Sequence, residues 1–92
     1  MSYGKIKIAI IGCGRISRNH IRSIFIHKKI CELVAICDKD IKRLNEARKI
    51  IEDCQTEFNH KLINLEEFDN DNSLFIDIKE NQLKVDLLIL TT

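Results

Sequence analysis

The chain has 92 residues, of which 45% are hydrophobic and 32% are charged, and its formal net charge is +1. Its length allows at most one small domain, and its composition is that of an ordinary globular protein. The small net charge produces no strong electrostatic field that would favour binding to nucleic acid or to an anionic membrane. The apolar runs, such as 8–11 and 87–90, are far too short to span a bilayer, and the first residues lack the long apolar segment of a signal peptide.

The first half of the chain alternates between strand and helix patterns. Residues 5–11, KIKIAII, become continuously apolar, which is typical of a strand buried on both faces of a parallel sheet. Residues 15–28 carry apolar side chains at helical spacing, and the β-branched run 32–37 predicts a second strand. Residues 40–54 return to helical spacing, with Asp40 as the expected N-cap.

The second half is less regular. Asn64 and Glu67 have the spacing of a capping pair, which predicts that a short helix begins there. The elements expected are a strand at 61–63, a helix at 65–68, a loop at 69–73, a helix at 74–83 and a strand at 85–91. This alternation predicts an α/β fold, a Rossmann-like parallel sheet with right-handed crossovers and the strand order 3-2-1-4.

The segment GCGRIS begins at Gly12, between the first strand and the first helix. Gly12 permits the tight turn, and Gly14 lets a pyrophosphate approach the backbone. The amides that open the helix, at Arg15 and Ile16, point at the phosphates, and the helix dipole adds attraction. Ser17 stands where a third glycine is expected, and it is small enough for close packing of helix and strand. The alternative is a tight turn with no ligand.

An acidic residue follows at the tip of the second strand. Asp38 lies 24 residues after Gly14, close to the spacing of about 20 in dinucleotide-binding motifs. Its carboxylate can accept hydrogen bonds from the ribose of NAD and would repel a 2′-phosphate, which favours NAD over NADP. Lys39, Lys42 and Arg43 could soften that preference. The alternatives are a helix cap or turn for Asp38 and a solvated helix face for the three cations.

Thr91 and Thr92 stand at the tip of the last strand, which lies beside the first strand in the expected order. The crevice there is where such folds bind ligands, so both threonines are candidate cofactor contacts, with ordinary strand-end residues as the alternative. His20 is expected to pack or cap rather than to catalyse, and His27 and His60 to lie at the surface. We expect neither a catalytic set nor a metal site in residues 1–92.

The four cysteines form no C-x-x-C pair and have mostly apolar neighbours in the sequence. We expect reduced, largely buried thiols and a cytoplasmic protein, with Cys13 as a small filler between two glycines.

Three blocks, KIKIAIIGCGRISRNHIRSI, ELVAICDKDIKRLNEA and VDLLILTT, resemble the start of the Gfo/Idh/MocA oxidoreductases. The family has a strand followed by G-x-G-x-(I/M) and a histidine, then a strand ending in aspartate with an arginine further on. Its fourth strand ends in a small residue, a threonine and a proline. The matching positions here are Gly12, Gly14, Ile16, His20, Asp38, Arg43, Thr91 and Thr92. The likeness is weakest between Asn59 and Lys84, where the join is longer and rich in asparagine.

The resemblance implies an NAD(P)-dependent oxidoreductase that moves a hydride from a sugar, cyclitol or nucleotide-sugar hydroxyl to nicotinamide. The segment GCGRISRNH is most similar to the corresponding segment of nucleotide-sugar 3-dehydrogenases of surface-polysaccharide synthesis. Residues 1–92 would then be part of the dinucleotide-binding domain of a larger two-domain, homo-oligomeric enzyme, whose lysine block and second-domain histidine lie outside them. The alternatives are a non-catalytic dinucleotide-binding or interaction module, or a piece without independent function whose open sheet edge makes it unstable.

Overall fold

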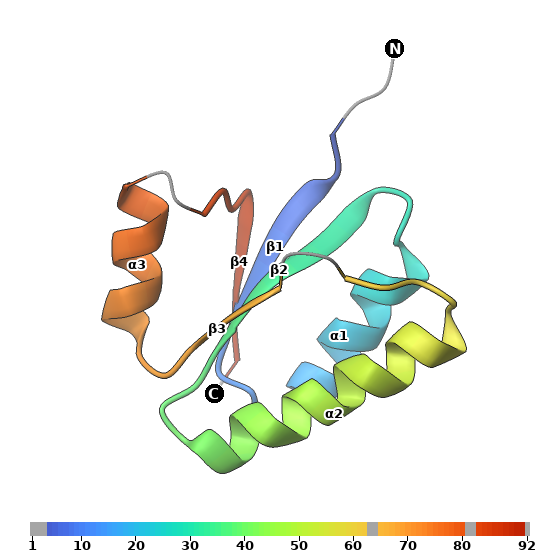
Figure 1. Ribbon diagram of the computed structural model, residues 1–92, viewed down its shortest axis with the longest axis horizontal. Coiled ribbons are helices and arrows are strands. Elements are labelled where there is room, and N and C mark those ends of the chain that lie inside the picture. Colours follow the sequence, from blue (N-terminus) through green and yellow to red (C-terminus); the bar gives the residue numbers. More distant parts are fainter. Residues whose placement is uncertain (1–3, 63–64, 81–82, 92) are drawn as a thin grey trace.

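The computed structural model describes residues 4–62, 65–80 and 83–91. Strands and helices alternate along them, and all the strand pairs are parallel. The elements are β1 (Ile6–Ile11), α1 (Ser17–Ile26), β2 (Cys31–Cys37), α2 (Ile41–Glu57), β3 (Glu66–Phe68), α3 (Asp71–Lys79) and β4 (Leu87–Leu90). The sheet has the order β3-β2-β1-β4. The predicted α/β class and the 3-2-1-4 order are therefore confirmed (Figure 1).

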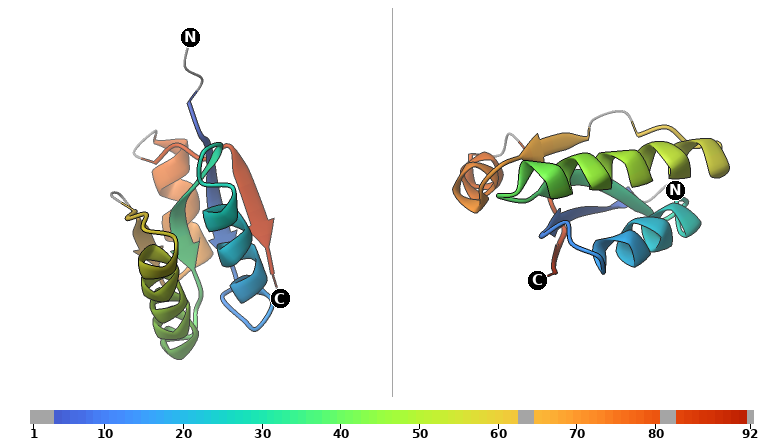
Figure 2. Two further views of the ribbon diagram at one scale, coloured as in Figure 1. Left: turned by 90° about the vertical axis from the view of Figure 1, so that its right-hand side faces the viewer. Right: turned by 90° about the horizontal axis from the view of Figure 1, so that it is seen from below.

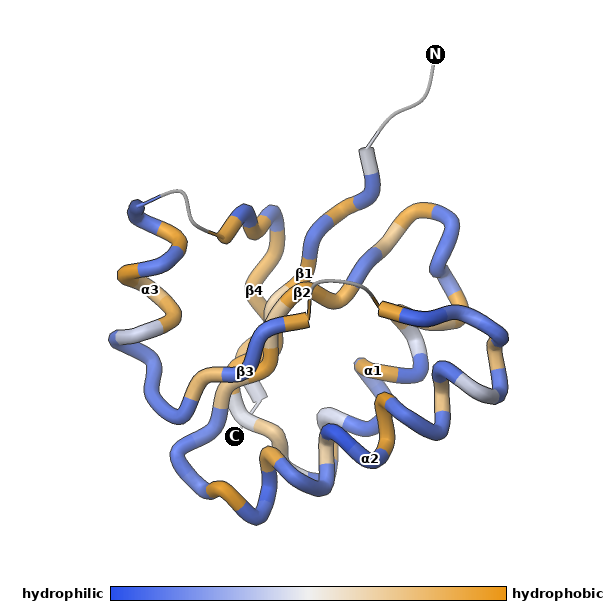
Figure 3. The backbone as a smooth tube through the Cα atoms, in the orientation of Figure 1, coloured by the Kyte–Doolittle hydropathy of each residue, from blue (hydrophilic) through white to orange (hydrophobic). Residues whose placement is uncertain are grey.

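Helices cover both faces of the sheet, as Figure 1 and Figure 2 show: α1 and α2 lie on one face and α3 on the other. Side chains of β1 alternate between the two layers, because successive residues of a strand point to opposite faces. Ile8 and Ile10 join the core beneath α1 and α2, while Ala9 joins the core that includes Leu74 of α3. Hydrophobic residues accordingly follow the central strands in Figure 3.

The region after α2 departs from the predictions. The short helix expected at 65–68 is wrong, because residues 66–68 form β3 and pair with β2 from Ala35 to Cys37. Pairing with a strand edge outweighs a local capping signal. Of the strand expected at 61–63, residues 61 and 62 are not in a strand. Residue 63 and Asn64 lie outside the described residues.

The last helix begins earlier than predicted. Asn70 caps α3 by accepting a hydrogen bond from the Ser73 amide at 2.8 Å, so the loop expected at 69–73 is helical from Asp71 onward. The helix ends at Lys79, before the expected residue 83. No helix of the described ranges is long and apolar enough to cross a membrane.

Strand β4 lies at the edge of the sheet, next to β1. Leu87, Leu88 and Leu90 are 48%, 39% and 71% exposed, whereas β2 is buried from Leu33 to Cys37. An apolar strand edge of this kind is prone to pair with another chain.

Candidate functional site

The loop between β1 and α1 makes a turn that requires glycine at its first position. Gly12 has a φ of +92°, a backbone conformation that residues with a side chain rarely adopt. A Cβ built there would overlap the Thr91 carbonyl oxygen. Gly14 differs, because the nearest atom to its Cβ position is Nη1 of Arg43, at 3.9 Å. The space beside Gly14 is open to a ligand.

Both neighbouring strands hold the beginning of this loop. From β2, the Cys37 carbonyl accepts the Gly12 amide at 2.7 Å, and Oδ2 of Asp38 accepts the Cys13 amide at 2.7 Å. On the other side, the Thr91 hydroxyl donates to the Gly12 carbonyl, and the Thr91 amide donates to the Ile11 carbonyl at 2.8 Å. The turn is fixed between strands that are far apart in the sequence.

The end of the loop, in contrast, presents unused donors. Within residues 4–62, 65–80 and 83–91, no acceptor takes the amide of Gly14, Arg15 or Ile16. Helix α1 begins directly after them and has no side-chain cap, so these amides stand at the positive end of the helix dipole. Consecutive free amides at a helix start form a ready site for phosphate.

Ser17 occupies the expected third-glycine position and is completely buried. Its hydroxyl donates to the Gly14 carbonyl at 2.6 Å, and its amide donates to the same carbonyl at 3.0 Å. The serine therefore fits between helix and strand and also closes the loop.

Asp38 lies at the carboxyl end of β2, half-buried, between the loop and α2. Its Oδ1 accepts a hydrogen bond from the Asp40 amide at 2.8 Å, and its Oδ2 accepts one from the Cys13 amide. Asp40 caps α2 by accepting the Lys42 amide at 2.9 Å, which confirms its predicted role. Each Asp38 oxygen has one backbone donor and retains capacity for another, so a ribose hydroxyl can still be accepted. The anchoring of the loop by Asp38 was not predicted from the sequence.

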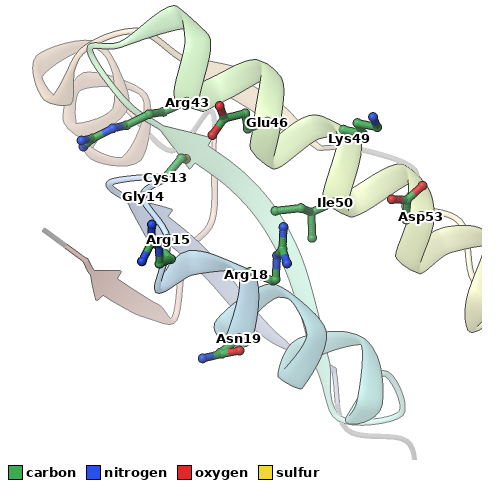
Figure 4. Close-up of a pocket in the computed structure, with 10 residues that line it drawn as sticks. All are labelled: Cys13, Gly14, Arg15, Arg18, Asn19, Arg43, Glu46, Lys49, Ile50 and Asp53. Atoms are coloured by element: carbon green, nitrogen blue, oxygen red, sulfur yellow. The ribbon is translucent and has the colours of Figure 1, made fainter.

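An open groove of about 730 Å³ runs from the loop between α1 and α2 (Figure 4). Its walls carry the predicted residues Gly14 and Arg15, and Arg43 of α2. Two further cations in it, Arg18 and Lys49, were missed, because only the packing of α1 on α2 brings them into one groove. The other predicted residues lie apart: Lys39, Lys42 and Ile16 are exposed outside the groove, Thr91 is buried, and Thr92 lies outside the described residues.

The cysteines are all free, and three of them are buried. Burial, followed by the nearby charge of Asp38, raises the pKa of Cys13 to about 11. Burial and a hydrogen bond to Asp71 raise the pKa of Cys37 to about 12. Both thiols stay protonated near neutral pH, in agreement with the prediction that Cys13 is a filler. The described residues contain no group of three or more histidine, cysteine or acidic side chains that could hold a metal.

Solved structures with the same fold include two dehydrogenases and a further oxidoreductase. The WlbA dehydrogenase of Chromobacterium violaceum, in complex with NADH and UDP-GlcNAcA, is 26% identical with a TM-score of 0.73, and the alignment covers 100% of this chain and 22% of that one. The Bordetella pertussis WlbA dehydrogenase, with the same two ligands, is 31% identical with a TM-score of 0.69, over 97% and 22% of the two chains. An Agrobacterium radiobacter oxidoreductase in complex with NAD⁺, L-tartaric acid and magnesium is 25% identical, with a TM-score of 0.62 over 97% and 21%.

The chain thus spans about a fifth of the length of these relatives. Curated protein sequences give no significant match. A family model described as "Oxidoreductase family, NAD-binding Rossmann fold" matches residues 6–92, which is nearly the whole chain. The glycine loop, Asp38 and the 3-2-1-4 sheet are the features expected of that fold, and the chain belongs to the Gfo/Idh/MocA oxidoreductase family.

Proposed function

We propose that this chain binds the dinucleotide of an NAD-dependent dehydrogenase that oxidises a hydroxyl group of a nucleotide sugar. The observation that carries the proposal is the row of free amides at Gly14, Arg15 and Ile16, at the start of α1. A pyrophosphate needs such donors and an unobstructed backbone. The open space at the Gly14 Cβ position meets the second requirement, so the residues fit this cofactor.

The chain's own residues would bind and orient the dinucleotide. The three amides hold the pyrophosphate, Gly12 sets the turn, and Asp38 accepts hydrogen bonds from the adenosine ribose. When bound, NAD supplies the hydride acceptor, and the protein's task is orientation. Lys39, Thr91 and Thr92 are proposed at the margin of this site. We assign no catalytic base to residues 1–92.

The substrate class rests on the relatives. Both WlbA dehydrogenases are bound to UDP-GlcNAcA, and they share 26% and 31% identity with this chain. A nucleotide-sugar hydroxyl is therefore the proposed substrate class. The four free thiols support a cytoplasmic location, and we propose a homo-oligomer for the full-length protein.

The test has two parts, both on the full-length protein. NADH binding is measured by fluorescence titration, and NAD reduction is followed with a panel of UDP-sugars, UDP-sugar acids and cyclitols. Binding together with turnover of a nucleotide sugar supports the proposal, while turnover of cyclitols alone contradicts the substrate class. Binding without turnover on any substrate favours a non-catalytic dinucleotide module, and absence of NADH binding contradicts both.

A further inference from the structure

Ser17 is a fully buried polar side chain at the first position of α1. A buried hydroxyl requires a hydrogen-bond partner, and this one donates to the Gly14 carbonyl at 2.6 Å. The Ser17 amide donates to the same carbonyl at 3.0 Å. A glycine or an alanine at this position would also be small, but it would leave the Gly14 carbonyl with the amide alone. The hydroxyl therefore does more than fit the available space.

The Gly14 carbonyl determines where the Arg15 amide points. These two groups belong to one peptide unit, which is planar and holds its C=O and its N–H on opposite sides. At the start of a helix, carbonyls point along the helix and the first amides point out of its N-terminal end. Both donors of Ser17 hold the Gly14 carbonyl toward the helix. The same two bonds therefore direct the Arg15 amide outward, to the place proposed for the pyrophosphate.

Little else restrains this peptide unit. Gly14 has no side chain, and the nearest atom to its Cβ position is Nη1 of Arg43, at 3.9 Å, so packing does not fix its rotation. Helix α1 also has no side-chain cap at Ile16. Across the described part of the chain, the bond from Ser17 is the one side-chain hydrogen bond made to the backbone of residues 14–16. Without this bond, the ligand itself would have to order the peptide unit, at a cost in affinity.

We propose that Ser17 is a positioning residue, whose hydroxyl holds the Gly14–Arg15 peptide unit in the orientation that binds a pyrophosphate. Because Ser17 is fully buried, it acts through the Arg15 amide and not by touching the ligand. This inference rests on the proposed function, since the orientation of the amide matters only for a bound dinucleotide. It assigns to the serine an effect that small size alone does not predict, confined to the diphosphate part of the ligand.

The test measures the binding of ADP and of adenosine to the full-length protein, by displacement of NADH in a fluorescence titration. The two competitors share the base and the ribose, so the ratio of their dissociation constants reports the diphosphate contacts. Ser17→Ala and Ser17→Gly remove the hydroxyl and introduce no atoms that the buried position must accommodate. Ser23→Ala is the matched control, because Ser23 is an exposed serine of the same helix.

We expect Ser17→Ala and Ser17→Gly to weaken ADP binding about 3- to 10-fold, the range for loss of a hydrogen bond between neutral groups, and adenosine binding by less than about twofold. Ser23→Ala should leave both dissociation constants unchanged. A general loosening of the fold would weaken both competitors alike. A change in the ratio therefore separates positioning of the amide from a purely structural role of the serine.

The possible failures are distinguishable. If the wild-type protein binds ADP more tightly than adenosine and Ser17→Ala keeps that ratio within about twofold, the positioning role is refuted and the proposed function stands. The same holds if Ser17→Gly binds ADP as tightly as the wild-type protein does, since only the small size of the residue would then matter. If the wild-type protein binds neither NADH nor ADP, the proposed function itself fails.

Discussion

The loop between β1 and α1 has two halves that differ in their bonding. The anchored half, Gly12 and Cys13, uses its backbone groups in hydrogen bonds to Cys37 and Asp38 on one side and Thr91 on the other. The open half, Gly14 to Ile16, leaves three amides without acceptors among the described residues. One half is specified by its protein neighbours and the other is left for a ligand.

This difference shows how a small site can be prepared before its ligand arrives. Unsatisfied amides have a cost unless water or a ligand serves them, so they remain where the chain is exposed at a helix start. The anchored half fixes their direction, which reduces the ordering that binding would otherwise require. Changes in the anchored half should therefore act first on stability, and changes in the open half on binding.

The largest effect is expected for Gly12→Ala. The positive φ costs about 1–2 kcal/mol for a residue with a side chain, and overlap with the Thr91 carbonyl adds about 1–3 kcal/mol. Urea denaturation of the full-length protein should show the free energy of unfolding lowered by about 2–5 kcal/mol. A loss below about 1 kcal/mol would mean that the Thr91 carbonyl, directly after β4, does not constrain the loop.

The next effect is expected for Asp38→Ala. The Cys13 amide loses its acceptor, which costs about 1–3 kcal/mol when the donor is left unsatisfied. Asp38→Asn keeps one acceptor oxygen and should lose less stability. Calorimetric titration of NAD tests the second role of this residue, since loss of the ribose contacts should weaken binding about tenfold or more. Unchanged affinity in Asp38→Ala would limit the residue to anchoring the loop.

A smaller effect is expected for Thr91→Val. Valine has nearly the shape of threonine but cannot donate to the Gly12 carbonyl, so unfolding should become easier by about 1 kcal/mol. Thr91→Ser retains the hydroxyl and serves as the control. Thermal melts of the three proteins check this order. If serine destabilises the protein and valine does not, the methyl packing of Thr91 matters and its hydrogen bond does not.

The central part of the fold could be predicted from the sequence because its apolar runs, helical spacing and capping residue all indicate the same elements. β1 and β2 are apolar runs buried on both faces, and α2 begins at a residue that caps it as expected, Asp40. The short β3 could not be found in this way. Glu66 and Glu67 have the composition of a helix start, and only the free edge of β2 makes them a strand.

The site shows the same limit. Gly12 and Gly14 were recognisable, because a turn with positive φ and a close backbone approach demand small residues at a fixed spacing. The anchoring roles of Asp38 and Thr91 were not, since they depend on hydrogen bonds between segments 25 and 79 residues apart. Likewise, no local pattern indicates that Arg18 faces the same groove as Arg43.

The smallest effect on stability, and the one that divides the two halves most clearly, is expected for Gly14→Ala. The new methyl group meets open space, with only the flexible end of Arg43 at 3.9 Å, so the free energy of unfolding should change by less than about 1 kcal/mol. NADH affinity should nevertheless fall about tenfold or more, because the methyl occupies the path by which the pyrophosphate reaches the free amides. Denaturation and fluorescence titration of the same preparation measure both. A variant that loses stability without losing affinity would place Gly14 in the anchored half and leave the phosphate site without its defining contact.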